Sequence, residues 1–349
     1  MDKLIVYKIN IPQAKSVKLD ETNFIFDSDP APKLLKFGFN SDTSMADIAS
    51  VLSNPYYRTG LYFDFDRDDA ASMQTALKKH FVLKKSDPRL ATICWEIYSS
   101  FLIPDKKKVT IATNEVASLE LVTESAEKLF KLKAKTDVVS LKDKAIPGTV
   151  FWFASQIPIE ENAYVHILMT ELPKLFAKQS TGSNLVVQIF GIQTQIMADI
   201  IYFLSTCYKE AYVMKPSVIS DLSDEKYVVL LNQTNSLKLK LSIPTGLFLT
   251  QLGIGPVPDI FVNTIQCLNA ELLARKVRSY QSIKRYIDSK IYEGITHDQM
   301  IQTQNLHTTQ WIKTFTNQKD LEKNLDQALI QSSTECDHAA EFNNLYAMI

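Results

Sequence analysis

Strand-like runs alternate with helix-length segments between Pro88 and Leu231, and this alternation constrains the fold more than any other feature of the sequence. The strand-like runs lie at Val109–Thr113, Asp137–Ser140, Thr149–Ala154, Asn184–Phe190, Ala211–Met214 and Lys226–Leu231. The helix-like segments lie at Arg89–Phe101, Ser118–Phe130, Glu161–Ala177 and Thr194–Tyr208. Such alternation predicts βαβ units and a largely parallel sheet. The last two strands are close in sequence, so we expect them to pair antiparallel.

The run Phe151-Trp152-Phe153 is apolar at every position. A strand that is buried on both faces of a parallel sheet needs that composition, so we interpret this run as a central strand. The alternative is a set of exposed aromatic rings that stack on a base or an RNA cap. The apolar composition favours the buried strand.

The segments on either side have a different character. Residues 1–85 combine strand-like runs at Leu4–Tyr7 and Phe24–Phe26 with a helical pattern at Ala70–Leu83. After Pro256 one apolar face recurs at helical spacing, and its members are Leu273, Val277, Tyr280, Ile283, Ile287 and Ile291. We therefore expect three regions: a mixed N-terminal extension (1–85), an α/β domain (86–256) and a helical C-terminal extension with an acidic tail (257–349).

Two charged stretches of the C-terminal region have opposite signs. The long helix carries basic side chains outside its apolar face, at Arg275, Lys276, Arg278, Lys284, Arg285 and Lys290. The tail after Asn317 is mainly acidic. A charged run is usually a solvated helix surface. The alternative is a docking surface, for RNA phosphates on the basic helix and for a protein on the tail.

Composition excludes several classes of protein. The chain of 349 residues is 46% hydrophobic with a net charge of −1, which excludes a disordered chain and a generally basic nucleic-acid coat. It has nine glycines, where average usage would give roughly 24, and no glycine cluster that would hold a nucleotide. The four cysteines and five histidines show no ligand spacing. We expect free thiols in a reducing, cytoplasmic location, with no metal and no membrane segment.

The region Pro88–Leu231 resembles the FtsJ-like family of ribose 2′-O-methyltransferases. The resemblance is carried by Lys215–Val229, with a Lys-Pro pair, a serine-rich turn and a glutamate before a strand, and by Asn184–Gly191. Pro88–Ile97 is similar to the helix before the family's first strand, and Val109–Ser118 falls where the cofactor loop belongs. The resemblance implies a Rossmann-like α/β sheet, with S-adenosylmethionine over a glycine-rich first loop.

In that family two lysines, an aspartate and a glutamate surround the ribose 2′-hydroxyl, so that one lysine can act as the base. The resemblance assigns these positions to Ile93, Phe153, Gln188 and Glu225, of which only Glu225 keeps the family residue. The other three side chains have no group that titrates near neutral pH. The loop segment Thr113–Ser118 has no glycine. The resemblance therefore implies an inactive member without a cofactor, whereas composition alone would make Glu225 an ordinary surface or turn carboxylate.

A second, scattered resemblance is to the small regulatory subunit of the poxvirus-type mRNA-capping enzyme. It lies in Pro30–Gly38, Cys207–Lys215 and Pro256–Asn263. That subunit has the same fold without catalytic residues and stimulates a cap methyltransferase on a larger subunit. The resemblance implies a non-enzymatic regulatory subunit of a viral capping or transcription complex, located in the host cytoplasm or the virion. Its partners would be the catalytic subunit, with RNA and RNA polymerase as further candidates.

Two alternatives stay open. One is an active S-adenosylmethionine-dependent mRNA cap ribose 2′-O-methyltransferase, whose lysines lie elsewhere in the sequence. The other is a structural protein of a viral transcription complex. Binding of S-adenosylmethionine separates the active enzyme from the inactive subunit. For a heteromer, we expect aromatic anchors at Tyr56, Tyr57, Tyr62 and Phe63.

Overall fold

The computed structural model of the chain describes most of its length. The described residues are 4–9, 24–32, 34, 45–62, 71–81, 88–101, 111–112, 122, 124–129, 148–154, 160–234 and 243–317. Three expected features lie outside them: the strand Asp137–Ser140, the loop segment Thr113–Ser118 and the acidic tail after Asn317.

The described strands form two sheets. Their bounds are β1 Ile5–Lys8, β2 Ile25–Asp27, β3 Ile111–Ala112, β4 Thr149–Trp152, β5 Asn184–Ile189, β6 Tyr208–Lys215, β7 Lys226–Gln233 and β8 Phe248–Gln251. The main sheet has six strands in the order β1-β6-β7-β5-β4-β3, and β2 pairs with β8 separately. The predicted strands among the described residues are confirmed within a few residues at their ends.

The main sheet is mixed, which corrects the expectation of a largely parallel sheet. β3, β4 and β5 are parallel neighbours. β7 lies between β5 and β6 and runs antiparallel to both, which confirms the antiparallel pairing expected for the last two strands. β1 adds an antiparallel edge strand beside β6. The difference is topological, because the turn after β6 returns β7 beside β5, and local sequence patterns do not specify that neighbour.

The helices agree with the predicted segments where these are described. Their bounds are α1 Met45–Ser53, α2 Ala71–His80, α3 Pro88–Phe101, α5 Glu161–Phe176, α6 Gln195–Thr206, α7 Asp259–Ser289 and α8 Ile295–Phe315, with a short 3-10 helix, η2, at Tyr57–Gly60. Residues 124–129 are also helical. α6 begins after Thr194, whose Oγ1 accepts a hydrogen bond from Met197 N at 3.3 Å, as an N-cap residue does.

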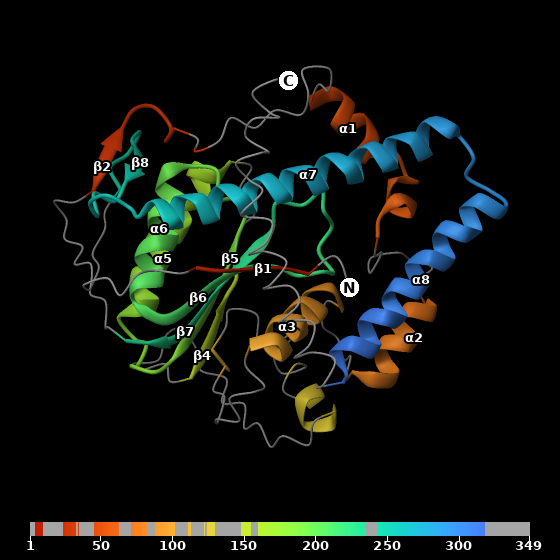
Figure 1. Cartoon of the computed structure of the whole chain (residues 1–349), viewed down its shortest axis with the longest axis horizontal. Coiled ribbons are helices and arrows are strands. Elements are labelled where there is room, and N and C mark those ends of the chain that lie inside the picture. Colours follow the sequence, from red (N-terminus) through yellow and green to blue (C-terminus); the bar gives the residue numbers. More distant parts are fainter. Residues whose placement is uncertain are drawn as a thin grey trace.

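Helices cover both faces of the main sheet (Figure 1). On one face α5, α6 and the first half of α7 share a core that contains Leu168, Ile200 and Phe261. On the other face α3 and α8 share a core that contains Trp95 and Trp311. The sheet and its two helical layers thus form an α/β/α arrangement around two apolar cores.

The central strand β4 contributes to both cores. Phe151 and Trp152 are 0% and 1% exposed and lie in the cores on opposite faces of the sheet. The interpretation of this run as a buried central strand is therefore confirmed. A strand with helices on both sides needs apolar side chains at every position.

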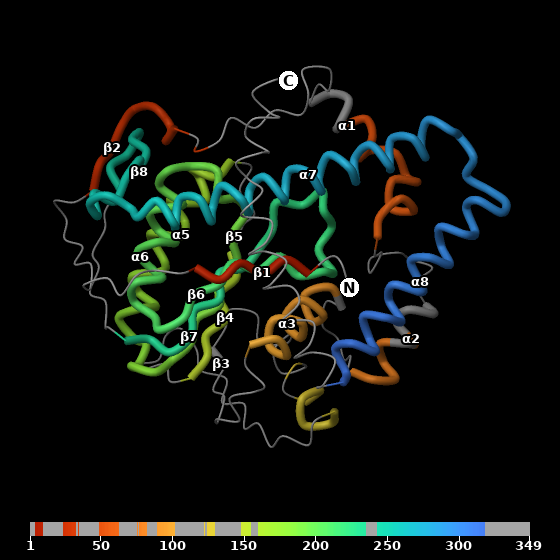
Figure 2. Tube along the Cα trace, viewed as in Figure 1, coloured from red at the N-terminus to blue at the C-terminus, as the bar shows by residue number. Residues whose placement is uncertain are grey.

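α7 leads away from the sheet, and α8 turns back toward it (Figure 2). α7 passes α1 and η2, and α8 returns against α2 and α3. Tyr280 and Ile283 of the predicted apolar face are buried with Val51 of α1. Ile291 is 52% exposed and lies beyond the helix, because Lys290 takes a left-handed φ of 54° and ends α7. The predicted face is therefore wrong at its last member.

The boundaries expected at residues 85 and 256 stay predictions, and core contacts cross both of them. β1 completes the main sheet beside β6. Trp95 Nε1 of α3 donates a hydrogen bond of 2.8 Å to the carbonyl oxygen of Phe315, at the end of α8. The two expected extensions thus share their packing with the central region.

Candidate functional site

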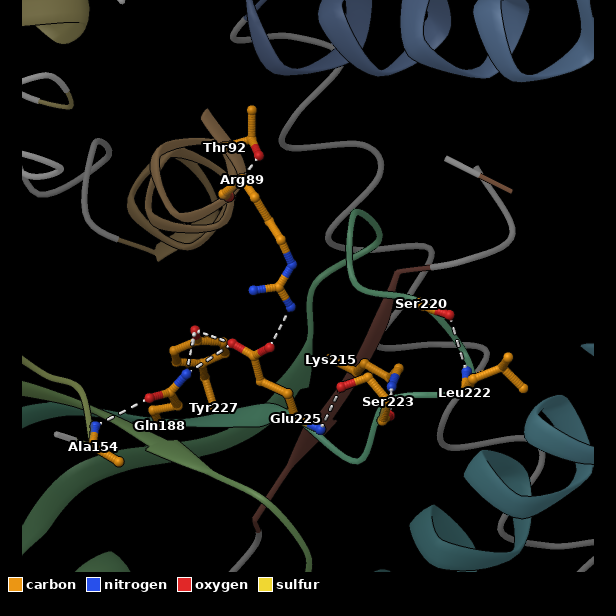
Figure 3. Close-up of polar contacts among 10 residues, drawn as sticks. All are labelled: Arg89, Thr92, Ala154, Gln188, Lys215, Ser220, Leu222, Ser223, Glu225 and Tyr227. Carbon is orange, nitrogen blue, oxygen red and sulfur yellow. Dashed lines mark hydrogen bonds and ion pairs between the residues drawn. The ribbon is translucent and has the colours of Figure 1, made fainter. Parts of the chain in front are cut away.

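Several polar side chains are buried together at one edge of the main sheet. β4 and β5 are parallel and end at this edge, and β7 begins there because it is antiparallel to β5, with Gln188 opposite Tyr227. In α/β sheets, ligands bind outside the carboxyl ends of the parallel strands. We therefore take this edge as the candidate site, and Figure 3 shows its polar contacts.

Glu225, immediately before β7, is the centre of a closed hydrogen-bond network and is 3% exposed. Its Oε2 lies 2.5 Å from Arg89 Nη2 on α3. Its Oε1 accepts hydrogen bonds from Gln188 Nε2 (2.9 Å) and Tyr227 Oη (2.7 Å). Gln188 Oε1 accepts the backbone N–H of Ala154 at 3.1 Å. Both carboxylate oxygens thus have donors, and one of these donors carries a full positive charge (Figure 3).

Two of the donors have fixed protonation states. Burial raises the pKa of Tyr227 well above its usual value, and the neighbouring Glu225 carboxylate raises it further, so Tyr227 stays a neutral donor. Arg89 keeps its proton, because a guanidinium group has a pKa above about 12. Neither group can act as a base near neutral pH. Through Arg89, Gln188 and Glu225, the network connects α3 with β5 and with the start of β7.

The four residues assigned by the family resemblance come to this edge from different elements. Ile93 lies on α3, Phe153 follows β4, Gln188 is in β5 and Glu225 precedes β7. Ile93 and Phe153 belong to the same apolar core as Tyr227, and the rings of Phe153 and Tyr227 meet edge to face with centroids 6.3 Å apart. Gln188 and Glu225 are in contact and Phe153 packs on Tyr227, but two of the four side chains are apolar and one is an amide.

Sequence reasoning missed Arg89 and Tyr227. Arg89 is four residues before Ile93, so helical periodicity places both on one side of α3, and that spacing was the available signal. Tyr227 is two residues after Glu225, so strand alternation places both on one face. Glu225 itself is buried at the end of the turn before β7, so the interpretation as a surface or turn carboxylate is wrong about the surface.

Two lysines at the same edge lie on the opposite face of the sheet. Lys215 ends β6 and Lys226 begins β7, and they are 3% and 4% exposed. Lys215 Nζ donates to the carbonyl oxygen of Ser223, and Lys226 Nζ donates to that of Asp224 at 2.7 Å. Burial lowers the pKa of Lys215 to about 7, and the ammonium group of Lys226 contributes to the decrease. Burial also lowers the pKa of Lys226.

The two lysines line a cavity of about 210 Å³. Its other lining residues come from the turn between β6 and β7, from the segment after β5 and from α7, and they are Gln193, Asp221, Ser223, Asp224, Asn269, Leu272, Leu273 and Lys276. Lys276 Nζ lies 2.8 Å from Asp224 Oδ2. Burial alone would raise the pKa of Asp224, but the ammonium groups of Lys276 and Lys226 outweigh it, and the pKa is lowered.

A buried carboxyl group, Glu96, holds the β6–β7 turn against α3 and α8. Its Oε1 accepts the backbone N–H of Ser217 at 2.6 Å, and its Oε2 accepts Ser217 Oγ (3.0 Å) and Trp311 Nε1 (2.9 Å). Burial raises the pKa of Glu96 to about 7, although these hydrogen bonds oppose the increase. Glu96 is therefore a titratable group in the middle of a core.

The N-terminus of α6 is occupied by a carboxylate of the chain itself. Glu161 accepts hydrogen bonds from the backbone N–H groups of Gln193 and Thr194 and from Thr194 Oγ1. A Cβ placed on Gly191 would lie 2.1 Å from Glu161 Oε2, so glycine at this position lets the carboxylate approach the backbone closely. Helix N-termini attract anions, and here Glu161 already fills that role.

The six basic residues proposed to contact RNA all lie on α7 or at its C-terminal end. Three of them are paired with acidic side chains: Arg275 with Glu271, Lys276 with Asp224 and Lys284 with Asp288. The exposed members are Arg278, Lys284, Arg285 and Lys290. The exposed part of α7 thus keeps a basic character near its C-terminal end.

The expected aromatic anchors make contacts within the chain. Tyr56 stacks on Tyr292 with ring centroids 4.0 Å apart, and Tyr62 stacks on His307 at 3.5 Å. Tyr57 is partly buried beside the small core around Val51. Phe63 lies outside the described residues.

The described residues contain no group of three or more His, Cys, Asp or Glu side chains that could hold a metal ion. In the same part of the chain, no helix combines the length and the apolar character needed to cross a membrane.

No protein-family model matches the sequence. The chain is 34% identical over 331 residues to the uncharacterized protein R383 of Acanthamoeba polyphaga mimivirus, and the match covers 94% of each protein. Identity at this level over nearly the full length of both chains reflects common descent and a shared fold. The chain therefore belongs to the same family as this mimivirus protein.

Proposed function

We propose that this chain is a catalytically inactive, methyltransferase-like subunit that binds and stimulates or scaffolds a viral mRNA-capping or cap-methyltransferase complex. The observation that carries the proposal is the Glu225 network at the carboxyl edge of the sheet. Two of the positions assigned by the resemblance to FtsJ-like methyltransferases, Gln188 and Glu225, are hydrogen-bonded there, and Phe153 packs on Tyr227, which supports descent from such a site. A viral relative is in keeping with a role in viral transcription and a location in the host cytoplasm or the virion.

The chemistry of the four assigned positions argues against methyl transfer to a ribose. Such a reaction needs a base within hydrogen-bond reach of the 2′-hydroxyl. Ile93 and Phe153 have no polar atom, and Gln188 is held by Glu225 and by the N–H of Ala154. The only family residue, Glu225, is engaged by Arg89 and Tyr227. A site built in this way stabilises the fold without activating an acceptor.

One observation favours the alternative, an active S-adenosylmethionine-dependent cap 2′-O-methyltransferase. Arg89 brings a positive charge from α3 to Glu225, one helical turn before Ile93. A cation from this helix is what the family chemistry needs at its first lysine. Arginine can position an anion, but it cannot take up a proton from a hydroxyl group, so it replaces the charge and not the base.

Calorimetric titration with S-adenosylmethionine separates the two functions. We expect no binding by the purified full-length chain, whereas an active FtsJ-like enzyme measured in parallel gives the positive control. The same preparations are then incubated with capped RNA and methyl-labelled cofactor. Micromolar binding, or transfer of label to the ribose next to the cap, would establish the enzyme and overturn the inactive subunit.

The regulatory part of the proposal needs its own measurement. We expect the chain to co-purify from infected cells with a capping or cap-methyltransferase subunit, and to raise the activity of that subunit. A coupling of about 1–3 kcal/mol corresponds to a stimulation of about 5- to 150-fold. The stimulation is measured for the wild type, for Arg89→Met at the site and for Lys209→Met. Lys209 is an exposed lysine, so its variant is the matched control. A chain that is isolated only as a monomer, with no associated enzyme, contradicts this role.

A further inference from the structure

The cavity on the other face of the sheet edge contains two buried ammonium groups whose role the proposed function does not explain. Strand alternation sends the side chains of Glu225 and Tyr227 to one face and that of Lys226 to the other. Lys226 is opposite Ile189, a member of the core under α5 and α6, and Lys215 has the same orientation as Val213 of that core. The two lysines therefore face the same cavity.

Neither ammonium group is satisfied by the described residues. An ammonium group has three hydrogen-bond donors. Lys215 donates to the carbonyl oxygen of Ser223, and Lys226 donates to the carbonyl oxygen of Asp224. Within the part of the chain that the structure describes, neither Nζ has a carboxylate oxygen within 4.0 Å. Each buried lysine thus has donors left for a ligand in the cavity.

Three carboxylates near the cavity are engaged by other groups. Asp224 pairs with Lys276 on α7, and Glu225 pairs with Arg89 on the other face. Glu161 accepts the N–H groups at the start of α6. Asp221 is partly exposed and lines the same cavity. With both lysines protonated, their two charges face the Asp221 carboxylate and leave the cavity a net positive charge.

The size of the cavity selects a small ligand. Pockets for drug-sized molecules have volumes of about 300–1,000 Å³, whereas this cavity measures about 210 Å³. Side-chain amides of Gln193 and Asn269 add polar groups to its lining, and Leu272 and Leu273 form an apolar wall. A tetrahedral oxyanion has the charge and the size for this space.

We propose that this cavity is a binding site for a phosphate group, held by the Nζ atoms of Lys215 and Lys226. Charge-assisted hydrogen bonds from ammonium to phosphate are among the strong polar contacts in proteins. The inference stands on the cavity and its lysines, and it does not depend on the proposed regulatory function. The phosphate group comes from free inorganic phosphate or from the phosphorylated 5′ end of an RNA.

The protonation of Lys215 supports the same assignment. Burial, and then the charge of Lys226, lowers the pKa of Lys215 to about 7, while Asp221, Asp224 and Glu225 oppose the decrease. Around Lys226, burial is opposed by Asp224 and Glu161 and reinforced by Lys276. An anion beside Lys215 favours its charged form. Binding of phosphate at about pH 7.5 is therefore expected to take up protons from solution.

The test is calorimetric titration of the full-length chain with inorganic phosphate at pH 7.5, in two buffers that differ in ionisation enthalpy. We expect saturable binding at one site with proton uptake. Lys215→Met and Lys226→Met should each weaken binding by at least about tenfold, since each removes one charge-assisted contact. Lys284→Met, at an exposed lysine that pairs with Asp288, is the matched control and should bind like the wild type.

Circular dichroism shows whether the variants fold, and Lys215→Gln, which keeps a polar side chain, replaces the methionine variant if that one does not. Thermal unfolding with increasing phosphate gives a second readout, because a ligand that binds the folded state raises Tm. Absence of saturable binding by the wild type overturns the proposal. Equal binding by the wild type and both lysine variants also overturns it, since an adventitious ion does not depend on these side chains.

A competition experiment identifies the source of the phosphate group. Short RNAs with a 5′-triphosphate, a 5′-monophosphate or a 5′-hydroxyl are titrated into the wild type and into Lys226→Met. Binding that requires both the 5′-phosphate and Lys226 assigns the site to an RNA end. Binding of inorganic phosphate that the phosphorylated RNAs do not displace assigns it to the free anion. RNA binding that is indifferent to the 5′ group and to Lys226, with no phosphate binding, overturns the site.

Discussion

At its carboxyl edge the sheet buries charged side chains on both faces, and these side chains have different kinds of partner on each face. On one face the Glu225 carboxylate is matched by a guanidinium group, an amide and a phenol. On the other face Lys215 and Lys226 have only backbone carbonyl oxygens as acceptors among the described residues. A buried charge is costly unless it is paired. The face that contains Glu225, here called the closed face, therefore has the character of a structural element. The face that contains Lys215 and Lys226, here called the lysine face, has the character of a site for a ligand.

The contrast originates in a short stretch of sequence. Glu225 and Lys226 are adjacent, and the alternation of a strand places their opposite charges on opposite faces instead of letting them pair. Each face then obtains its partners from a different helix, Arg89 from α3 for Glu225 and Lys276 from α7 for the turn residue Asp224. The segment that joins β6 to β7 thus contributes charged side chains to both faces of the sheet.

The largest expected effect is on the lysine face. The pKa of Lys215 is lowered to about 7 in the folded chain, so the unfolded chain binds more protons between that pH and the usual lysine pKa. Its contribution makes the wild type more stable as pH rises from about 7 to 10.5. We measure the unfolding free energy of Lys215→Met and of the wild type in urea at several pH values. The value for the variant relative to the wild type should be highest at or below pH 7 and should fall by about 4–5 kcal/mol by pH 10.5.

The control for that prediction is Lys284→Met, whose difference from the wild type should not change over the same range. Lys284 is exposed and pairs with Asp288 on the surface of α7. A constant difference between Lys215→Met and the wild type would mean that Lys215 titrates normally, and the contrast between the two faces would disappear.

A slightly smaller effect is expected for Glu96. Its hydrogen-bond donors are neutral groups of Ser217 and Trp311, whereas Glu225 pairs with the cation of Arg89. The pKa of Glu96 is raised to about 7 in the folded chain, so the folded state binds more protons than the unfolded state between about pH 4.5 and 7. Its contribution to stability is complete below that range and is lost as pH rises through it. The unfolding free energy of the wild type relative to Glu96→Gln should fall by about 3 kcal/mol between pH 4 and pH 8.

Tryptophan fluorescence provides an independent check, because Trp311 donates directly to Glu96. We expect its emission in the folded chain to titrate near neutral pH in the wild type and to be insensitive to pH in Glu96→Gln. A wild-type stability that is flat from pH 4 to 8, relative to the variant, would place the pKa of Glu96 at an ordinary value.

The next effect tests the closed face. Arg89→Met leaves the Glu225 carboxylate buried with only neutral donors, and breaking a buried pair in this way costs about 3–5 kcal/mol. Because the Arg89 side chain is 32% exposed, solvent offsets part of this cost, and we expect a loss of about 2 kcal/mol in urea unfolding. Glu225→Gln combined with Arg89→Met should lose less than the two single changes together. Additive losses would mean that the two groups do not interact.

The sequence predicted the elements of this edge but not the partners that meet there. Strand and helix patterns are local, so β5, α6, β6 and β7 lie where the alternation placed them. The position of β7 between β5 and β6, and the contact of Arg89 with a glutamate 136 residues away, depend on topology. For the same reason Glu225, which is polar and follows a serine-rich turn, could be taken for a surface residue. The family resemblance assigned it to a site, whereas the local pattern did not.

The end of α7 shows the opposite error. Its apolar spacing continues to Ile291, yet the helix ends at Ser289 because Lys290 adopts a left-handed conformation. Helices more often end at glycine in this conformation, and the chain has none at that position. The sequence therefore carried no stop signal there, and periodicity extended the predicted face by one member too many.

The smallest effect on stability is expected from the exposed basic side chains of α7, and it decides whether positive charge outside the two faces has a function. Reversal of Arg278, Lys284 and Arg285 to glutamate should change the unfolding free energy little, because exposed pairs contribute about 0–1 kcal/mol each. If these side chains contact phosphates, the full-length chain should bind single-stranded RNA more weakly. The slope of log affinity against log salt should then decrease by about 2, since each contact contributes about 0.7. Reversal of the exposed Lys78, Lys79 and Lys209 makes the same change in net charge elsewhere on the surface and serves as the control. Equal losses from the two triple variants would assign the effect to net charge, and no loss from either would leave α7 with a solvated basic surface.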